Sequence, residues 1–376
     1  MQHSILLFGP RGVGKTTFIQ DLHRDHIFTV NLLDADTLLR YSRRKQALKE
    51  DVLQKIKTDQ IRYCFIDEVQ KIPELLDVVH DLIQSTHCQF LISGSSARKL
   101  KRSGVNLLAG RALQYYLYPF AYAEIKHQFK LSEVLQFGTL PSVFTAEHAL
   151  KIKILQTYVN TYLREEIQAE GLVRNLGSFS RFLDVAASQC GDILSYQNVA
   201  QGCQVSPKTV QGYYSILEDT LVGFRLEPWL KSLKKRLVAH PKFYFFDTGV
   251  TNAINHRLTS LLDPQTTGRL FEQLLILETY RMAHYLGSEA RLFYWRTEHG
   301  AEIDLLIEKH GQLTGAFEFK STAEVSARDF SGLKAFGQEH STVPRQLVYN
   351  GLHSYDAPHA SVWTWQQFLE QLPNYL

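Results

Sequence analysis

Short apolar runs alternate with polar segments along the first third of the chain. Four of these runs have the length and apolar character of a buried strand: residues 5–8, 63–66, 89–92 and 115–118. Residues 17–22 follow the first run with apolar positions at helical spacing. Strands that alternate with helices are typical of an α/β fold with a parallel sheet. We expect such a domain over residues 1–121.

Helical periodicity begins at about Tyr122 and is clearest over residues 150–168, where apolar residues recur every three or four positions. This spacing predicts a helical connector over residues 122–190. Its apolar face is suited to packing within one chain and equally to packing against a second copy.

Residues 194–217 have the pattern of a helix-turn-helix unit, with a short helix, a turn and a second helix. Ser206 is suited to cap the second helix, and Pro207 to occupy its first position. A strand expected at residues 223–228 favours a winged form of the unit, which we place at residues 191–265. Some units of this kind bind DNA and others only pack, and the sequence leaves both open.

In a DNA-binding helix-turn-helix unit, the first residues of the second helix meet the base edges. Here these positions are Lys208, Thr209 and Gln211. A basic run suited to phosphate contacts follows the expected strand and consists of Lys231, Lys234, Lys235 and Arg236. The same run is also compatible with an ordinary solvated surface.

Composition narrows the class of protein. A chain of 376 residues with 44% hydrophobic residues is long enough for two or three domains with sizeable cores. Its net charge of +3 excludes a uniformly basic coat for nucleic acid, although local patches are compatible with it. The 4 cysteines are scattered without a Cys-x-x-Cys pair, which argues against a zinc site or a disulfide framework. With no signal peptide and no apolar run of about 18 residues, we expect a cytoplasmic protein without a membrane span.

The segment directly after the first apolar run carries the strongest motif of the chain. Gly9–Thr17 reads Gly-Pro-Arg-Gly-Val-Gly-Lys-Thr-Thr, a complete G-x-x-x-x-G-K-[ST] phosphate-binding loop. Its glycines allow backbone N–H groups and the start of the next helix to face phosphate. We predict that ATP and Mg²⁺ bind here, with Lys15 on the β- and γ-phosphates and the Thr16 hydroxyl on the metal. The residues expected to bind the nucleotide are Gly9, Arg11, Gly12, Val13, Gly14, Lys15, Thr16 and Thr17. The Thr17 side chain is also suited to packing or capping the helix.

Acidic and hydroxyl residues follow the next predicted strands. The second of the four runs ends in Asp67 and Glu68. In phosphate-loop enzymes the first acid at this place holds Mg²⁺, and the second acts as general base on the attacking water. The third run ends in Ser-Gly-Ser-Ser, where Ser93 and Ser95 lie on one side and are candidates to sense the γ-phosphate. A simple turn has the same composition.

Arg111 lies between a basic stretch, residues 98–102, and the last apolar run of the expected α/β domain. An arginine at this place is a candidate arginine finger or second nucleotide sensor. It is equally compatible with an ordinary solvated or ion-paired arginine, and the sequence favours none of these.

Near the carboxyl end, two predicted strands, residues 301–307 and 315–320, form a hairpin with a turn at residues 309–311. Strict alternation predicts that Asp304, Glu318 and Lys320 share one face of the hairpin. The apolar residues expected on the opposite, inward face are Ile303, Leu305, Ile307, Phe317 and Phe319.

Together these motifs resemble those of AAA-type ATP-binding proteins, widespread in prokaryotes, that join a phosphate-loop domain to a C-terminal restriction-endonuclease-like domain. The segments that carry the resemblance are residues 9–16, 65–73, 93–96, 108–111, 138–141 and 242–249, and the hairpin. The resemblance implies an AAA core of a kind that often assembles into rings, so we expect a homo-oligomer. It also implies a restriction-endonuclease-like α/β domain over residues 266–376.

The hairpin is similar to the D…E-x-K arrangement of the restriction-endonuclease-like superfamily. In that superfamily two carboxylates, here Asp304 and Glu318, hold Mg²⁺, and the lysine, here Lys320, orients or acidifies the attacking water. Glu272 matches an additional acid often found upstream. A solvated hairpin face and a fold that binds nucleic acid without cleaving it are the alternatives.

We therefore expect an ATPase that couples Mg²⁺-dependent hydrolysis of ATP to movements of the helix-turn-helix and nuclease-like parts. Lys15, Glu68, Ser93 and Arg111 are its candidate catalytic residues. Nucleic acid is the expected partner, with DNA favoured over RNA. One alternative is an ATP-regulated nuclease that cleaves DNA or RNA. Another is a slow ATP switch that engages a protein partner.

Overall fold

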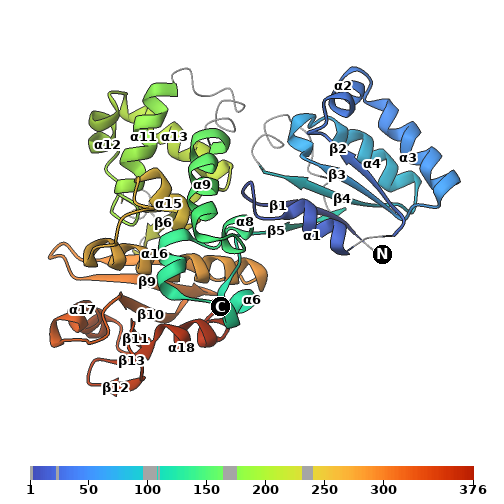
Figure 1. The fold of residues 1–376 in the computed structure, drawn as a ribbon. Helices are drawn as coiled ribbons and strands as arrows, with labels where there is room; N and C mark the ends of the chain where they lie inside the picture. Colours follow the sequence, from blue (N-terminus) through green and yellow to red (C-terminus); the bar gives the residue numbers. More distant parts are fainter. Residues whose placement is uncertain (1–2, 23–24, 96–107, 109–110, 164–175, 231–239) are drawn as a thin grey trace. The chain divides into compact units, whose positions relative to one another are not determined.

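The computed structural model describes residues 3–22, 25–95, 108, 111–163, 176–230 and 240–376 (Figure 1). The chain divides into two compact units, Met1–Tyr118 with Asp219–Val222, and Pro119–Glu218 with Gly223–Leu376. Each unit is built around a β-sheet of its own. No helix among the described residues has the length and apolar character needed to cross a membrane.

The first unit contains a five-stranded parallel sheet in the order β2-β3-β4-β1-β5. Its strands are β1 (Ser4–Phe8), β2 (Ile27–Asn31), β3 (Tyr63–Asp67), β4 (Gln89–Gly94) and β5 (Ala112–Tyr116). The run expected as a strand at residues 115–118 thus pairs three residues earlier, at β5, because Ala112–Tyr116 lies in register with all of β1. The predicted α/β domain with a parallel sheet is confirmed. Since parallel strands end at one edge, the segments after β1, β3 and β4 meet there.

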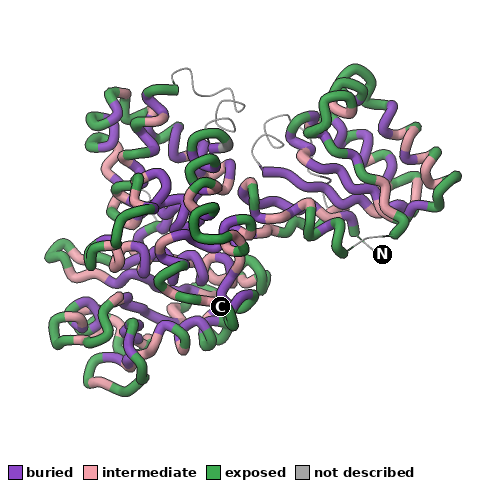
Figure 2. The backbone as a smooth tube through the Cα atoms, viewed as in Figure 1, coloured by how far each residue is buried: buried purple, intermediate pink, exposed green. Residues whose placement is uncertain are grey.

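Helices cover both faces of this sheet (Figure 1). They are α1 (Lys15–Leu22), α2 (Ala35–Arg43), α3 (Gln46–Asp59) and α4 (Leu75–Ser85), with a short 3₁₀ turn, η1 (Val69–Lys71), after β3. The larger core joins Leu48 and Leu76 of α3 and α4 to Phe90 of β4, and a smaller one joins Ile19 of α1 to Phe65. Figure 2 shows β1, β3 and β4 as largely buried. Sheets covered on both faces favour continuous apolar strands, which explains why β1, β3 and β4 were visible in the sequence. The strand β2 was not predicted, and only one of its residues is buried.

The second unit begins with helices. They are α6 (Tyr122–Ile125), η2 (Lys126–Gln128), α7 (Leu131–Phe137), α8 (Pro141–Phe144), α9 (His148–Thr157), the π-helical η3 (Tyr158–Leu163) and α11 (Leu176–Ser188). The amphipathic segment predicted at residues 150–168 is helical as far as residue 163, and its remaining residues lie outside the described part of the chain.

The predicted helix-turn-helix elements are present as α12 (Tyr196–Cys203) and α13 (Pro207–Asp219). The Thr209 N–H donates to Ser206 Oγ at 3.1 Å, so Ser206 caps α13 as expected. Aromatic rings bind the unit to α11: Phe182 packs edge-on against Tyr214, with ring centroids 4.9 Å apart. The basic run at residues 231–236 lies outside the described residues.

The strand expected as a wing is β6 (Gly223–Pro228). It pairs antiparallel with β7 (Lys242–Phe245) and parallel with β8 (Arg291–Arg296). The expected wing strand therefore belongs to an eight-stranded mixed sheet in the order β12-β13-β11-β10-β9-β8-β6-β7.

The other strands of this sheet are β9 (Glu302–Lys309), β10 (Gln312–Lys320), β11 (Arg345–Tyr349), β12 (Tyr355–Ala357) and β13 (Ala360–Thr364). The helices are α15 (Thr248–Ile254), α16 (Pro264–Tyr285), α17 (Ser331–Glu339) and α18 (Trp365–Gln371), with 3₁₀ turns η4 (Ala327–Phe330) and η5 (Leu372–Asn374). The predicted hairpin is β9 and β10, which pair antiparallel.

The alternation predicted for this hairpin is wrong at Ile303. The pairing of β8 with β9 shifts register between Phe293 and Trp295, which places Ile303 and Leu306 in one core with Leu333 of α17. Phe317 and Phe319 instead pack against Phe368 of α18. The expected inward residues are therefore divided between two cores, because the sheet is covered on both faces and a bulge interrupts β9.

A buried aspartate joins two segments quoted for the family resemblance. Asp247 Oδ2 accepts a hydrogen bond from the Thr139 N–H at 2.8 Å, and Oδ1 accepts one from the Val250 N–H at 3.1 Å, which caps α15. Gly138 has φ +72°, and a Cβ there would lie 2.0 Å from Asp247 Oδ1. Only glycine fits this approach. Residues 138–141 and 247–249 thus contact each other through Asp247.

Candidate functional site

The phosphate-binding loop spans the turn from β1 to α1. Gly12 and Gly14 have φ values of 83° and 88°, the left-handed region that favours glycine. A Cβ at Gly9 would lie 2.2 Å from the Leu117 carbonyl oxygen, so this position also requires glycine. The local backbone geometry thus explains why each of these three positions is a glycine. Of the other predicted loop residues, Val13 is buried, Arg11 is half-buried and Thr17 is exposed on α1.

Lys15 opens α1 and turns its side chain into the loop. Its Nζ donates to the carbonyl oxygens of Gly9 at 2.8 Å and Pro10 at 3.0 Å, and the residue is only 6% exposed. A buried ammonium needs such acceptors. The loop therefore holds a positive charge at its centre, and this charge would stabilise a bound anion.

Thr16 and Asp67 meet beside this lysine. Thr16 Oγ1 donates to Asp67 Oδ2 at 2.8 Å. Ser93 Oγ donates to Asp67 Oδ1, and the Glu68 N–H donates to Ser93 Oγ at 3.2 Å. Hydroxyl and carboxylate oxygens are the ligands that Mg²⁺ prefers. The residues present thus fit a magnesium ion held by Thr16 and Asp67.

Glu68 directly follows β3 and has φ 60° and ψ 46°, a left-handed backbone that is uncommon outside glycine. Its side chain is half-buried and accepts a hydrogen bond from Gln70 Nε2. Gln70 Nε2 also donates to Ser95 Oγ at 2.8 Å. Of the two serines singled out, Ser93 contacts Asp67 and Ser95 contacts Gln70. Sequence reasoning missed Gln70.

Arg111 lies away from the loop of its own chain. Its carbonyl oxygen accepts from the Ser4 N–H at 3.2 Å, at the end of β1 opposite the loop. Five strand residues separate these ends, roughly 16 Å at the usual rise. Its guanidinium Nη1 lies 2.7 Å from His80 Nε2 of α4. The structure therefore does not bring Arg111 to the in-chain sensor position, and a role toward a second copy stays a prediction. The basic stretch at residues 98–102 lies outside the described residues.

The second candidate site lies on the sheet of the second unit. The Phe319 N–H donates to Asp304 Oδ2 at 2.7 Å, and Lys320 Nζ donates to Glu318 Oε1 at 2.6 Å. Glu318 Oε2 is buried without a hydrogen-bond partner among the described residues. The structure thus gathers the acids and the lysine of the predicted motif.

Burial and mutual repulsion set the charges of this site. Burial raises the pKa of Asp304 well above its usual range, and the carboxylates of Glu318 and Glu272 raise it further. Burial also raises the pKa of Glu318 to about 7, against the opposing effect of Lys320. Two close buried acids that resist ionising together are typical of functional sites, and also of some structural clusters.

Three residues that the sequence did not single out complete this cluster. Lys242 Nζ of β7 lies 2.6 Å from Glu302 Oε1 and 3.1 Å from Glu272 Oε1. The Tyr244 hydroxyl donates to Glu272 Oε1 at 2.6 Å. Burial opposes the charge on Lys242, but Glu272, Asp304 and Glu302 raise its pKa above the usual value. We name this group the acidic cluster: Lys242, Tyr244, Glu272, Glu302, Asp304, Glu318 and Lys320.

The hydrogen bonds of the acidic cluster decide which of its oxygens are suited to a metal ion. In the parts of the chain that the structure describes, no group of three or more His, Cys, Asp or Glu side chains is arranged to hold a metal ion. Lys242 and Tyr244 already engage Glu272. The donors suited to a cation are therefore Asp304 and the unpartnered Glu318 Oε2.

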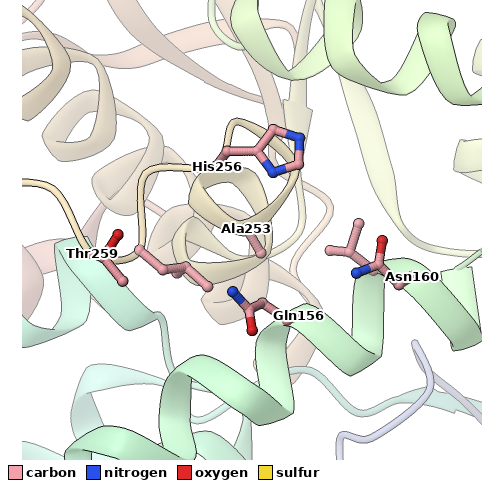
Figure 3. Close-up of a pocket in the computed structure, with 7 residues that line it drawn as sticks. Gln156, Asn160, Ala253, His256 and Thr259 are labelled. Atoms are coloured by element: carbon pink, nitrogen blue, oxygen red, sulfur yellow. The ribbon is translucent and has the colours of Figure 1, made fainter.

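A small cavity of 130 Å³ lies between α9, η3 and the end of α15 (Figure 3). It is lined by Gln156, Val159, Asn160, Ala253, His256, Leu258 and Thr259. It contains neither a pair of acids nor a lysine. The phosphate-binding loop and the acidic cluster hold candidate site residues named above.

Family models match three consecutive parts of the chain. Residues 2–126 match an AAA domain, residues 128–261 match a domain of unknown function (DUF8612), and residues 267–368 match another (DUF4143). An AAA domain at the amino end and a domain of unknown function at the carboxyl end confirm the resemblance at that level. The AAA domain supports ATP binding and hydrolysis by the first unit.

The relatives carry no assigned activity. Uncharacterized proteins of Mycobacterium tuberculosis and Mycobacterium bovis are each 29% identical over 69% of this chain, and the match spans 59% of their own length. An uncharacterized protein of Methanocaldococcus jannaschii is 23% identical over 80% of this chain and 72% of that protein.

Two solved structures align with parts of the chain. The Aeropyrum pernix ORC1 protein in complex with DNA aligns with a TM-score of 0.31 and 11% identity, over 68% of this chain and 87% of that chain. The replication initiator DnaA bound to AMPPCP and single-stranded DNA aligns with a TM-score of 0.30 and 14% identity, over 57% of this chain and 82% of that chain. Likenesses at this level do not bear on what the present chain binds.

Proposed function

We propose that this chain, which carries an AAA domain at its amino end and a DUF4143 domain at its carboxyl end, binds ATP with Mg²⁺ and hydrolyses it. One observation carries the proposal. Thr16 and Asp67 share a hydrogen bond of 2.8 Å beside the buried Lys15, although they are 51 positions apart in the sequence. An ordinary glycine-rich turn does not require this meeting of hydroxyl, carboxylate and ammonium.

Each residue then has a distinct part in the reaction. Lys15 would place its ammonium against phosphate oxygens, and Thr16 and Asp67 would hold the metal ion. Bound Mg²⁺ supplies charge neutralisation for the phosphates. Glu68 orients the attacking water and accepts its proton at the carboxylate. Ser93 keeps Asp67 in place through its hydroxyl.

Nucleic acid is the proposed partner, with DNA favoured over RNA. Lys208 and Gln211 are exposed at the start of α13, whereas Tyr213 and Tyr214 of the same helix are buried. A helix that buries one side and presents polar residues near its amino end has the form needed for groove contact. A homo-oligomer, in which Arg111 reaches the nucleotide of a second copy, is part of the same proposal.

An ATP-regulated nuclease is the second candidate function. The buried, unpartnered Glu318 Oε2 favours it, since a buried acceptor without a donor suits a cation. In that case Asp304 and Glu318 would hold Mg²⁺, and Lys320 would orient the attacking water.

The test measures phosphate release from ATP by the purified chain with Mg²⁺, alone and with double-stranded DNA, single-stranded DNA or RNA. We expect turnover that Lys15→Ala abolishes and Lys57→Ala, at an exposed site on α3, leaves unchanged. Turnover that is equal in wild type and Lys15→Ala would contradict the ATPase.

The nucleic-acid arms of this test separate the possible partners. Stimulation by DNA supports the proposed partner, whereas failure of every nucleic acid to bind or stimulate points to a protein partner and the slow switch. Strand cleavage that Lys320→Ala removes would favour the nuclease. Cleavage that survives Lys320→Ala would exclude the acidic cluster as its source.

A further inference from the structure

Gln70 occupies the turn that follows the proposed general base. It lies in η1, two residues after Glu68, and is only 7% exposed. Its Nε2 donates to both Glu68 Oε2 and Ser95 Oγ. The amide nitrogen has two hydrogens, and each is used by one of these two residues. One buried amide thus links Glu68 to the segment after β4.

The other end of the same amide has no hydrogen-bond partner in the part of the chain that the structure describes. Gln70 Oε1 is buried without a hydrogen bond among the described residues, and it would lie 3.0 Å from a Cβ at Gly94. Buried carbonyl oxygens are normally paired. An apolar residue of similar shape would avoid this cost, so packing alone does not account for a glutamine here. The contacts of Nε2 are the remaining reason for it.

Ser95 connects Gln70 to the strand whose Ser93 also binds Asp67. Ser93 lies near the end of β4 and Ser95 directly follows that strand; Ser93 binds Asp67, and Ser95 binds Gln70. The metal-holding acid and the general base are therefore each tethered to the end of the same strand. A displacement of this segment would reach Glu68 through Gln70.

We propose that Gln70, held by Ser95, is a positioning residue that fixes the Glu68 carboxylate and so sets the rate of ATP hydrolysis but not ATP affinity. This inference rests on the proposed ATPase function. Glu68 has a left-handed backbone, which is sparsely populated outside glycine and persists only where neighbouring contacts hold it. The hydrogen bond from Gln70 is such a contact. The amide also has two orientations. Turning its oxygen toward Glu68 would set two acceptors against each other and release the carboxylate.

The experiment compares Gln70→Met, which keeps the size and loses the hydrogen bonds, with Gln54→Met at an exposed site on α3. For Gln70→Met we expect kcat to fall about tenfold or more, while KM and the Kd of a fluorescent ATP analogue stay within about twofold. Ser95→Ala should lower kcat in the same direction, and Ser95→Thr, which keeps the hydroxyl, should restore it. Gln54→Met should match wild type.

A second readout needs no nucleotide. Thermal unfolding of Gln70→Met, Glu68→Ala and the double variant forms a cycle, in which coupled residues give Tm shifts that differ from additivity by about 2 °C or more. Unchanged or raised kcat in Gln70→Met, or additive Tm shifts, would overturn the inference. If Gln70→Met does not fold, Ser95→Ala and Ser95→Thr decide it by the same kcat criterion. An inactive wild type would instead contradict the ATPase itself.

Discussion

Thr16 Oγ1 donates a hydrogen bond of 2.8 Å to Asp67 Oδ2, and the two residues are 51 positions apart in the sequence. Because parallel strands end at one edge of the sheet, the loop after β1 and the acid at the end of β3 meet there. The two oxygens proposed to hold Mg²⁺ are therefore placed together by the fold itself.

Thr16→Ala should separate metal-assisted from metal-free nucleotide binding. The change removes a proposed metal ligand and leaves the phosphate contacts of Lys15. We expect ATP affinity in MgCl₂ to fall roughly 10- to 100-fold, the range for impaired metal sites, and affinity in EDTA to stay within about twofold. Titration with a fluorescent ATP analogue measures both, with Thr58→Ala on α3 as control. Equal losses in MgCl₂ and EDTA would speak against a metal ligand at Thr16.

Gly138→Ala should destabilise the second unit. A Cβ would lie 2.0 Å from Asp247 Oδ1, and φ is +72°. The clash displaces a buried carboxylate that caps α15, so we expect a loss of more than about 2 kcal/mol in the free energy of unfolding. Gly212→Ala is the matched control: it lies in α13 with nothing within 4 Å of a Cβ, and should stabilise by about 0.5–1 kcal/mol. Denaturant unfolding measures both. A neutral Gly138→Ala would show that the Asp247 contact does not constrain the fold.

Glu318→Gln should change how stability depends on pH. The pKa of Glu318 is raised from 4.5 to about 7, so the folded form binds the proton more tightly than the unfolded form. Its stabilising contribution is complete below pH 4.5 and is lost as the pH rises through 7. The penalty at pH 8 is about 3 kcal/mol, the difference of roughly 2.5 units at 1.36 kcal/mol each.

Glutamine does not titrate, so Glu318→Gln should gain stability relative to wild type between pH 4.5 and 8. Thermal unfolding at a series of pH values measures the difference in Tm, and Glu324→Gln at an exposed site on the same unit is the control. A difference in Tm that is constant with pH would contradict the raised pKa.

The sequence was informative where structure depends on neighbouring residues. The phosphate-binding loop follows β1 directly, and Ser206 and Pro207 begin α13 as predicted, because caps and tight turns are local. The strands β1, β3 and β4 were visible because helices cover both faces of the sheet, whereas β2, which has one buried residue, was not predicted. The division at residues 122, 191 and 266 stays a prediction, although β6 and β7 pair into the sheet that holds β9 and β10.

Features that depend on long-range pairing were not predictable. The bulge in β9 placed Ile303 on the face opposite to the expected one, and such a bulge has no reliable sequence signal. Lys242 joined the acidic cluster only because β7 lies beside Glu302 and Glu272 in the fold. The position of Arg111 followed from where β5 begins in register with β1. Gln70 was visible in the motif but gained a role only through Ser95.

The general base is the residue on which hydrolysis, as distinct from binding, depends. Glu68→Gln keeps the size of the side chain and one acceptor oxygen but cannot accept the proton. Binding should therefore survive the change and turnover should not.

The measurement is single-turnover phosphate release from ATP by wild type and Glu68→Gln at saturating enzyme and Mg²⁺, with nucleotide binding measured on the same samples. We predict that Glu68→Gln binds ATP with an affinity within about threefold of wild type. Its rate of phosphate release should be lower by a factor of about 100 or more, which is the lower end of what a general base contributes. Equal rates of phosphate release in the two proteins would contradict the account.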